Sequence, residues 1–298
     1  MKKLSVYEEV TNQIIAKMEQ GTDRWFAPWD CNGAHHNGVT KHEYSGINIL
    51  LTYFATMENG FTSNEWFTFN QSKTIGGQVK KGSKATKIVA YSVNKYDADG
   101  KKLPDDTPDD QVHKVIPFAK AIPLFNRDQI EGLPETESNS EESNVLVDAD
   151  ISSKLNKYLA AEGVELTLKG DRAYYNRTKD AIVLPELTRF HSTEGYFATL
   201  FHEVAHSTGH KNRLNREFGK FKSPEYAFEE LVAELAAGFM CSKLGISGRL
   251  EDHASYISSW IKLLKEDDKA IFRASALAEK ATKYVFKSFS VDKAKIAA

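Results

Sequence analysis

Cysteine, a membrane-length apolar run and a signal-peptide pattern are all scarce or missing in this chain of 298 residues. Its two cysteines, Cys31 and Cys241, lie far apart, which gives no disulfide framework and suits a reducing compartment. The most apolar stretch, Leu231 to Cys241, contains a glutamate and is too short to cross a bilayer. Glutamates at positions 8 and 9 interrupt the apolar run that a signal peptide needs. We therefore expect a cytoplasmic protein with no membrane partner.

An excess of charge of either sign is also missing, because 39 basic residues balance 41 acidic ones to a formal net charge of −2. This value gives no global signature of a nucleic-acid-binding protein. The average hides a cancellation, however. Residues 67–96 contain six lysines and no acidic residue, whereas residues 104–110 and 131–150 are acidic. Only the lysine-rich segment is expected to face a nucleic acid.

The chain is longer than one compact domain usually is, and its composition suggests where it divides. No lysine or arginine lies between Arg127 and Lys154, and the intervening residues are mostly acidic or small and polar. Such a segment buries too little apolar surface to offset its ordering entropy. We predict a first domain at 1–130, an acidic flexible linker at 131–150 and a second domain at 151–298, each with its own core.

The first domain has the pattern of a small α+β unit. Apolar residues spaced along 6–18 predict a helix that ends near Gly21, and a second helix is expected over 46–58 with Ser45 as its N-cap. Strand-like runs follow at 65–69, 87–93 and 112–120. A turn at 97–100 makes the last two a hairpin, and the acidic stretch 104–110 is expected to be a solvated loop.

The second domain has a different pattern. A helix is predicted over 151–161, followed by a hairpin of strands at 173–176 and 181–185. From Glu194 onward nearly all of the sequence has helical periodicity. A short sheet followed by helices is the layout of compact metallopeptidases. The predicted fold class is therefore α+β with two domains, the second zincin-like.

The clearest chemical motif is His202-Glu203-x-x-His206. Residues four apart share one face of a helix, so both imidazoles can bind one tetrahedral ion. Zinc in such a site lowers the pKa of a bound water towards about 7, and Glu203 is placed to take its proton as general base. Zn²⁺ is the expected cofactor, with Mn²⁺ or Co²⁺ as alternatives.

A third ligand is needed, and two patterns can supply one. The metzincin pattern requires a histidine at position 212, where this chain has Asn212. The other pattern takes a glutamate from a downstream helix, and the apolar segment 227–237 contains three. We expect Glu230 to bind the metal and Glu234, on the same face, to hold a ligand histidine. Glu229 remains the alternative ligand, because sequence does not fix the rotation of this helix.

Two downstream residues are candidates for stabilising the oxyanion of a transition state. His253 and Tyr256 lie at helical spacing beyond the metal motif. Structural roles at a helix surface or core edge are the competing interpretation of both. His210 is a further histidine near the motif, and we interpret it as a helix-end or substrate-side residue.

The first domain combines aromatic and basic residues in the way that single-stranded nucleic acids require. Bases stack on aromatic platforms while a basic groove follows the backbone. The glycine-containing loop 76–84 adds flexible backbone and free amides that suit phosphates. Core tryptophans and surface lysines are the alternative explanation. The candidate DNA-binding residues are Trp25, Trp29, Trp66, Lys73, Lys80, Lys81, Lys84 and Lys87.

Beyond these patterns, the sequence resembles the ArdC family of antirestriction proteins of conjugative plasmids over nearly its whole length. In the first domain the resemblance rests on Tyr44-Ser-Gly-Ile-Asn48, Trp66-Phe-Thr-Phe-Asn-Gln71, Gly76-Gly-Gln-Val-Lys-Lys-Gly82 and Gln129-Ile-Glu-Gly-Leu-Pro134. In the second it rests on His202-Glu-Val-Ala-His-Ser-Thr-Gly-His210, Arg213-Leu214 and Glu229-Glu-Leu-Val-Ala-Glu234.

The resemblance implies a single-stranded-DNA-binding domain joined to a zinc domain similar to SprT-like metallopeptidases. It also implies protection of incoming plasmid DNA from restriction in a recipient bacterium. The expected partners are single-stranded DNA and a restriction-related or DNA-bound protein as substrate. Two rival functions stay open: a protease dedicated to DNA-bound proteins, and a DNA-binding protein whose metal site is structural or vestigial.

Overall fold

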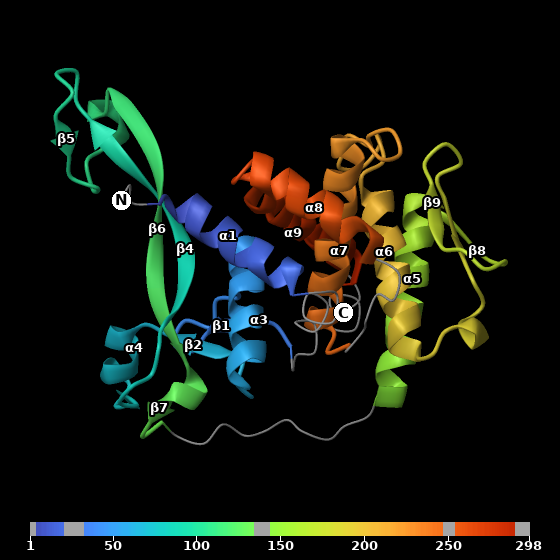
Figure 1. The fold of residues 1–298 in the computed structure, drawn as a ribbon, viewed down its shortest axis with the longest axis horizontal. Coiled ribbons are helices and arrows are strands. Elements are labelled where there is room, and N and C mark those ends of the chain that lie inside the picture. The colour runs from blue at the N-terminus through green and yellow to red at the C-terminus, as the bar shows by residue number, and fades with distance from the viewer. Residues whose placement is uncertain (1–3, 21–32, 134–143, 247–253, 290–298) are drawn as a thin grey trace, which may run out of the picture.

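A computed structural model describes residues 4–20, 33–133, 144–246 and 254–289. It has an N-terminal lobe built around a long two-stranded ribbon and a C-terminal lobe made mostly of helices (Figure 1). Among the described residues, none of the helices is both long and apolar enough to cross a membrane. The α+β class predicted from the sequence is confirmed, with short sheets in both lobes.

Two helices of the N-terminal lobe lie close to the predicted positions. Helix α1 spans Val6–Glu19 and begins with a capping box, in which Ser5 accepts from the amide of Glu8 and the Glu8 carboxylate accepts from the amide of Ser5. Helix α3 spans Ile47–Asn59 and ends at Gly60 in the left-handed conformation (φ 64°). Its N-cap is Gly46, without a side-chain cap, so the prediction of Ser45 as the cap was wrong by one residue.

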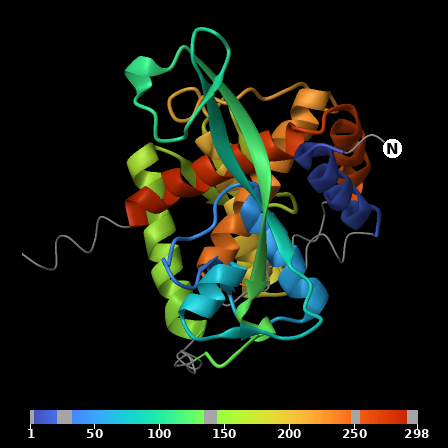
Figure 2. The same cartoon turned by 90° about the vertical axis from the view of Figure 1, so that its left-hand side faces the viewer.

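The main sheet has the order β1-β2-β6-β4-β5, and its long strands form the ribbon. Strand β4 (Thr86–Tyr96) pairs with β6 (Lys114–Asn126) antiparallel along its whole length, as the hairpin prediction required. The turn at 97–100 leads into β5 (Lys102–Leu103), which pairs back onto β4, and a short 3-10 helix η2 (Asp109–Gln111) follows. Figure 2 shows this ribbon running over most of the height of the molecule.

Short elements complete this end of the lobe. Strand β1 (His36–Asn37) pairs with β2 (Glu65–Phe67), and β3 (Gln78–Val79) pairs with β7 (Ile130–Glu131), which follows the 3-10 helix η3 (Arg127–Gln129). The expected strand 65–69 stops at Phe67, because helix α4 (Phe69–Thr74) starts two residues later. Its first turn is stabilised by a capping box between Thr68 and Gln71. Strong capping at Thr68 therefore overrides the aromatic strand pattern.

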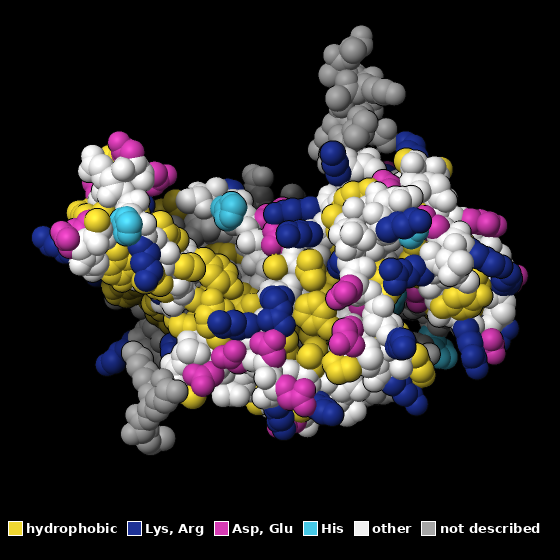
Figure 3. Space-filling view, turned by 90° about the horizontal axis from the view of Figure 1, so that it is seen from above, with side chains coloured by type: hydrophobic (Ala, Val, Ile, Leu, Met, Phe, Trp, Pro, Cys, Tyr) yellow, Lys and Arg dark blue, Asp and Glu magenta, His cyan; other side chains and the backbone are white. Residues whose placement is uncertain are grey.

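The ribbon is tied to α3 by one side-chain amide. Asn48 donates to the carbonyl of Val89 and accepts from its amide, both at 2.8 Å. Asn48 thus takes the place of a neighbouring strand at this point of β4, because its side-chain amide satisfies both the backbone N–H and the backbone carbonyl of Val89. Farther along, Tyr91, Val93, Val115 and Ile116 are exposed, and Figure 3 shows hydrophobic side chains gathered on the side where the ribbon lies.

The C-terminal lobe begins with α5 (Asn144–Glu162), so the last seven residues of the predicted linker, 144–150, belong to this helix. Its sheet has the order β8-β10-β9, with β8 (Glu165–Leu168) parallel and β9 (Tyr174–Asn176) antiparallel to β10 (Ala181–Leu184). The predicted hairpin is confirmed, but β8 was not predicted. After the 3-10 helix η4 (Leu187–Arg189) come α6 (Thr193–Thr208), α7 (Pro224–Lys243), α8 (Ala254–Glu266) and α9 (Ala270–Phe289).

The two lobes share one hydrophobic core, which corrects the expectation of two separate ones. A single cluster of buried residues joins α1 and α3 to α5, α6, α7, α8 and α9. Polar contacts cross the same boundary: the hydroxyl of Thr11 donates to the carbonyl of Asp268 at 2.6 Å, and Tyr53 bonds Ser242. A smaller cluster around Trp66 belongs to the N-terminal lobe alone. The central region of the predicted linker, residues 134–143, lies outside the described residues.

Candidate metal centre

Helix α6 brings the motif histidines into the middle of the C-terminal lobe. Ser192 caps its start by accepting from the amide of Gly195 at 3.0 Å. From Leu200 to Thr208 every residue of this helix is buried, because the helix is covered by α7 on one side and by the short sheet on another. His202 and His206 therefore project from one face of α6, and both side chains are almost fully buried.

Helix α7 supplies the carboxylates. It starts with Ser223 as N-cap, which accepts from the amide of Tyr226 at 3.2 Å, and Pro224 occupies the first turn. Its buried face presents Glu229, Glu230 and Glu234 to α6. Three buried carboxylates against two imidazoles make this the most acidic part of the core, and such a set is stable only with cationic partners.

His202, His206 and Glu230 form the cluster that can hold an ion. One ligand atom from each lies within 4.8 Å of the others, and all three residues are buried. The two Nε2 atoms are 3.1 Å apart, and each lies 3.5 Å from an oxygen of Glu230. Two donors on a tetrahedral ion with bonds of about 2.0–2.1 Å are separated by about 3.3 Å. The spacing of the three side chains therefore fits a tetrahedral divalent ion with one position left for another ligand.

The other two glutamates orient the histidines instead of joining the cluster. Glu229 lies 3.2 Å from Nδ1 of His206, and Glu234 lies 3.4 Å from Nδ1 of His202. Both contacts are on the side of the ring away from Nε2, so each carboxylate fixes the ring and leaves Nε2 to the ion. Glu230 thus lies beside both Nε2 atoms, whereas the alternative ligand Glu229 and the proposed orienting residue Glu234 each lie beside an Nδ1 atom.

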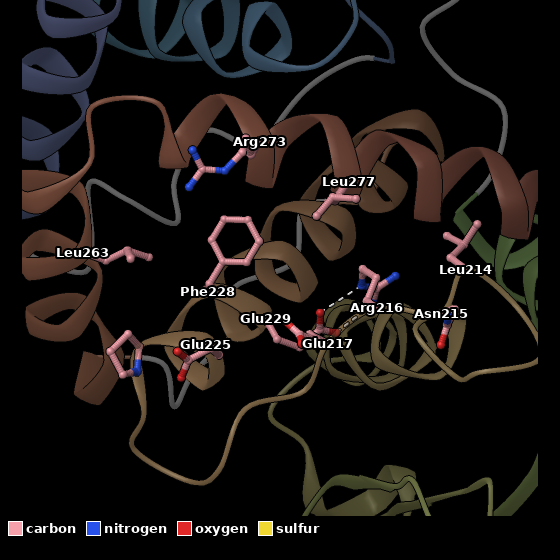
Figure 4. Close-up of a pocket in the computed structure, with 11 residues that line it drawn as sticks. Leu214, Asn215, Arg216, Glu217, Glu225, Phe228, Glu229, Leu263, Arg273 and Leu277 are labelled. Carbon is pink, nitrogen blue, oxygen red and sulfur yellow. Dashed lines mark hydrogen bonds and ion pairs between the residues drawn. The ribbon is translucent and has the colours of Figure 1, made fainter.

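Arg216 holds Glu229 in place. Its guanidinium donates to both oxygens of Glu229, at 2.9 and 2.7 Å (Figure 4). It also donates to the hydroxyl of Thr208 and to the carbonyl of Ala205. The pair forms the inner wall of a cavity of about 420 Å³ behind the metal cluster. Sequence analysis missed Arg216, since nothing in its spacing ties it to the motif.

The carboxylates control the protonation of both histidines. Burial disfavours the charged imidazole, but hydrogen bonds with Glu230 and Glu234 outweigh it and raise the pKa of His202 to about 10. Glu229 and Glu230 likewise overcome burial and raise the pKa of His206 to about 9. Burial acts to raise the pKa of Glu230, but the two histidines lower it well below its usual range. The cluster thus attracts positive charge, whether protons or a metal ion.

A cleft of about 360 Å³ opens over the cluster, and Glu203 lines it together with the three clustered residues. Tyr256, predicted as an oxyanion candidate, is also in the wall, and its hydroxyl lies 3.0 Å from that of Tyr226. Tyr226 was not predicted, although it precedes Glu230 by one helical turn on α7 and shares its face. His253 lies outside the described residues.

Strand β9 forms the opposite wall of the cleft. Arg177, just after this strand, stacks on Phe218 with its guanidinium carbon 4.7 Å from the ring centre, and both line the cleft. Arg213 ties the hairpin to the end of α6 by donating to both oxygens of Asp180. His210 lies 3.7 Å from the same carboxylate and outside the cluster, as expected of a helix-end residue.

The predicted DNA-binding residues separate into exposed and buried ones. Trp66 is 0% exposed, and its indole N–H donates to Nδ1 of His35 at 3.3 Å. Burial lowers the pKa of His35 to about 3, so this imidazole is neutral and accepts the bond. The assignment of Trp66 to a base-stacking surface is therefore corrected, because its faces are used in the core. Trp25 and Trp29 lie outside the described residues.

The predicted lysines are at the surface, near the end of the ribbon opposite β5. Lys73 lies over the ring of Phe69 at 4.7 Å, and Phe69 is 46% exposed. Lys80 donates to the carbonyl of Asp128 at 2.8 Å, which holds the loop after β3 against η3. Lys84 and Lys87 line a cavity of about 510 Å³ between α1, α3 and the start of β4. These four lysines and Lys81 are all exposed.

Comparison with known protein families gives two matches that divide the chain. Residues 4–125 match the N-terminal domain of anti-restriction factor ArdC, and residues 153–277 match a zincin-like metallopeptidase. Among curated proteins, an uncharacterized protein y4eC of Sinorhizobium fredii (strain NBRC 101917 / NGR234) is 32% identical over 92% of this chain and 89% of the relative. A DNA primase TraC of Escherichia coli is 34% identical over 95% of this chain, which spans only 20% of that primase.

Two solved structures are similar over the whole fold. The metal-free crystal structure of the antirestriction protein ArdC from plasmid R388 superimposes with a TM-score of 0.76 at 35% identity. It is covered over 98% of its length by 96% of this chain. The Mn(II)-bound crystal structure of the same protein gives a TM-score of 0.74 at 34% identity, with 96% of this chain and 99% of that chain covered.

Proposed function

Because the chain belongs to the ArdC family of antirestriction proteins, we propose that it binds single-stranded DNA through its N-terminal lobe and hydrolyses a protein with its metal centre. In this proposal it protects incoming plasmid DNA from restriction in the cytoplasm of a recipient bacterium. The observation that carries the hydrolytic part is the cluster of His202, His206 and Glu230 beneath a cleft lined by Glu203.

The site holds the parts that peptide hydrolysis needs. A divalent metal, Zn²⁺ or else Mn²⁺ or Co²⁺, supplies Lewis-acid activation of water and of a carbonyl group. His202, His206 and Glu230 would hold the metal, while Glu229 and Glu234 would keep the two rings oriented. Glu203 accepts the proton of the attacking water, and the hydroxyl of Tyr256 donates to the oxyanion.

An extended peptide has one suitable edge beside this site. Strand β10 lies between β8 and β9, so both of its edges are occupied and neither can pair with a substrate strand. Strand β9 is the edge strand whose residues, Tyr174 and Tyr175, line the cleft, whereas the cleft has no lining residue from the other edge strand, β8. A peptide added to β9 runs directly past the metal cluster, with main-chain hydrogen bonds supplying affinity.

The DNA-binding part is supported by the exposed lysines near α4 and β3. Phe69 takes the stacking role that Trp66 cannot, because it is half-exposed and lies beneath Lys73. Two tight turns at Gly76 (φ 83°) and Gly82 (φ 88°) flank Lys80 and Lys81 and require glycine. Lysines on such a frame suit the phosphates of a single strand without reading its bases.

Glu203→Ala tests the proposal, because it removes the general base and leaves the three proposed ligands. We expect it to retain metal and single-stranded-DNA affinity, to lose peptide cleavage, and to lose protection of transferred plasmid DNA in a restricting recipient. Proteins cleaved by wild type but not by this variant, with and without single-stranded DNA, identify the substrate. Protection that survives Glu203→Ala would leave DNA binding as the antirestriction activity. Cleavage without any effect on restriction would favour a protease for DNA-bound proteins.

A further inference from the structure

A second cavity lies beside the catalytic cleft, on the far side of two tyrosines. Its volume is about 450 Å³, and its walls come from the segment 221–224, the first turn of α7 and one face of α8. Tyr226 and Tyr256 line both this cavity and the cleft over the metal cluster. A peptide whose backbone crosses the cluster can therefore place one side chain in this second cavity. The cavity in Figure 4 shares Pro224 and Leu263 with this second cavity. Unlike the second cavity, it has no lining residue in common with the catalytic cleft.

An exposed aromatic ring stands at the rim of this second cavity. Phe221 is 70% exposed, more than any other large hydrophobic residue identified as exposed in the described part of the chain. Its ring meets that of Tyr226 edge-on at 5.3 Å between centres. Burial of apolar surface stabilises a fold by about 25 cal/mol per Å². Because most of the Phe221 side chain stays in water, it contributes little to the free energy of folding.

The segment that carries Phe221 is held firmly against α7. A Cβ at Gly219 would clash with the backbone nitrogen of Tyr226 and with Ser223, so the chain approaches α7 more closely there than any other residue allows. Lys222 adopts a positive φ of 67°, which is rare for a residue with a side chain. Residues in sparsely populated backbone conformations cluster at active sites and ligand-binding segments, so this segment is a candidate for such a role.

The opposite wall is fixed as well. Trp260 is fully buried and donates from its indole nitrogen to the carbonyl of Ala227 at 3.0 Å, which locks α8 onto the first turn of α7. Tyr256 lies one turn earlier on α8 and stacks on Trp260. Leu263 completes the apolar surface, while Lys262 and Glu266 bring opposite charges to the rim. The interior therefore favours an uncharged side chain over an acidic or a basic one.

We propose that this cavity, lined by Phe221, Leu263 and the Tyr226–Tyr256 pair, is a specificity pocket for a large apolar side chain, preferably aromatic, of the peptide substrate. The inference rests on the proposed peptidase function and adds to it the class of residue that the substrate carries near its cleaved bond. An aromatic side chain stacks on Phe221 and the tyrosines and gains burial that a smaller one does not.

Binding of defined peptides to the full-length Glu203→Ala protein tests the pocket without requiring hydrolysis. The probes are fluorescently labelled hexapeptides that differ at one position, which is Phe, Leu, Ala or Asp, with that position moved along the peptide. We expect a preference for Phe over Ala of about tenfold at one position. Phe221→Ala added to this protein reduces the preference to about twofold or less, and Leu263→Ala weakens it.

Leu187→Ala is the matched control, because Leu187 is likewise exposed (47%) and lines neither cavity. It should leave the preference unchanged, and circular dichroism verifies that all variants are folded. Equal binding of the four peptides, or a preference that survives both Phe221→Ala and Leu263→Ala, overturns the pocket. Parallel cleavage assays with wild type separate the two ideas: cleavage without side-chain preference removes the pocket alone, and Phe221-dependent binding without cleavage removes the peptidase alone.

Discussion

The metal centre and the lysine-bearing end of the N-terminal lobe differ in how deeply their functional side chains are buried and how firmly they are held. At the metal centre every proposed ligand is buried and each histidine is fixed by its own carboxylate. At the other site the lysines are exposed, and Lys80 is the one whose ammonium is held by a neighbouring backbone carbonyl. Chemistry on a small scissile group requires preorganised atoms, whereas a flexible polyanion is bound by charges that adapt to it. The two lobes nevertheless share one hydrophobic core, so we expect them to unfold together although their proposed activities differ.

Removal of one carboxylate from the metal cluster should give the largest effect. We expect Glu230→Gln to abolish measurable binding of Zn²⁺ and Mn²⁺, because it removes a proposed ligand. Glu229→Gln, the adjacent residue, should weaken binding by about 10- to 100-fold, since it only orients His206. Isothermal titration calorimetry on metal-stripped protein distinguishes the two. Equal losses for both variants would contradict the separation of ligand from orienting residue.

A cavity in the shared core should destabilise both lobes together. Leu50→Ala on α3, at a fully buried position, should cost about 2–5 kcal/mol. Trp66 and Trp260 are buried in different lobes, so variants that keep one or the other report on each lobe by fluorescence during urea unfolding. We expect one coincident transition in both, shifted equally by Leu50→Ala. A shift confined to the Trp66 reporter would show that the lobes unfold independently.

The raised histidine pKa values give the metal-free protein a defined pH dependence. His202 and His206 have pKa values of about 10 and 9 in the folded state, above the unfolded value of about 6.5. Their contribution to stability is therefore complete below pH 6.5 and is lost as the pH rises through 9 to 10. Thermal melts in chelator should show this loss, and it should be smaller in Glu230→Gln. An identical pH profile for the two proteins would contradict the role of Glu230.

Charge removal at the exposed lysines should have the smallest effect per residue. Each lysine–phosphate interaction that is removed changes the slope of log affinity against log salt by about 0.7 for a single strand. We expect Lys80→Ala with Lys81→Ala to weaken binding of an oligothymidine and to flatten that slope. The control pair is Lys101→Ala with Lys102→Ala at the far end of the ribbon, where the slope should not change. An unchanged slope in the first pair would exclude this loop from the DNA-binding surface.

Helical spacing explains which parts of the site were predictable. The positions of His202 and His206 follow from i,i+4 geometry, and the positions of the α7 glutamates follow from one apolar helix. Whether Glu229 or Glu230 faces the two histidines depends on the rotation of α7 about its axis. Arg216 helps to fix this rotation by bonding Glu229, and it lies in a segment that has no recognisable sequence pattern. Phe221 was missed because tertiary packing alone brings it against Tyr226. Tyr226 itself could have been found from its i,i+4 spacing to Glu230 on α7.

The N-terminal lobe was harder to predict for a different physical reason. Aromatic residues at alternating positions indicate a strand, but the sequence does not tell which face is buried. Trp66 is in the core and Phe69, three residues later, is half-exposed, because the strand ends at Phe67 and α4 starts at Phe69. The shared core was also not predictable: the helical periodicity of α1 and α3 requires a partner surface without identifying it.

The common core has a consequence for how such genes can be rearranged. A fragment with only the N-terminal lobe would expose the apolar faces of α1 and α3, and one with only the C-terminal lobe would expose their counterparts on α7, α8 and α9. A recombination product that carries only one lobe should therefore fold poorly. In TraC, the region that is 34% identical to this chain spans both lobes, since it covers 95% of the chain, although it makes up only 20% of that protein.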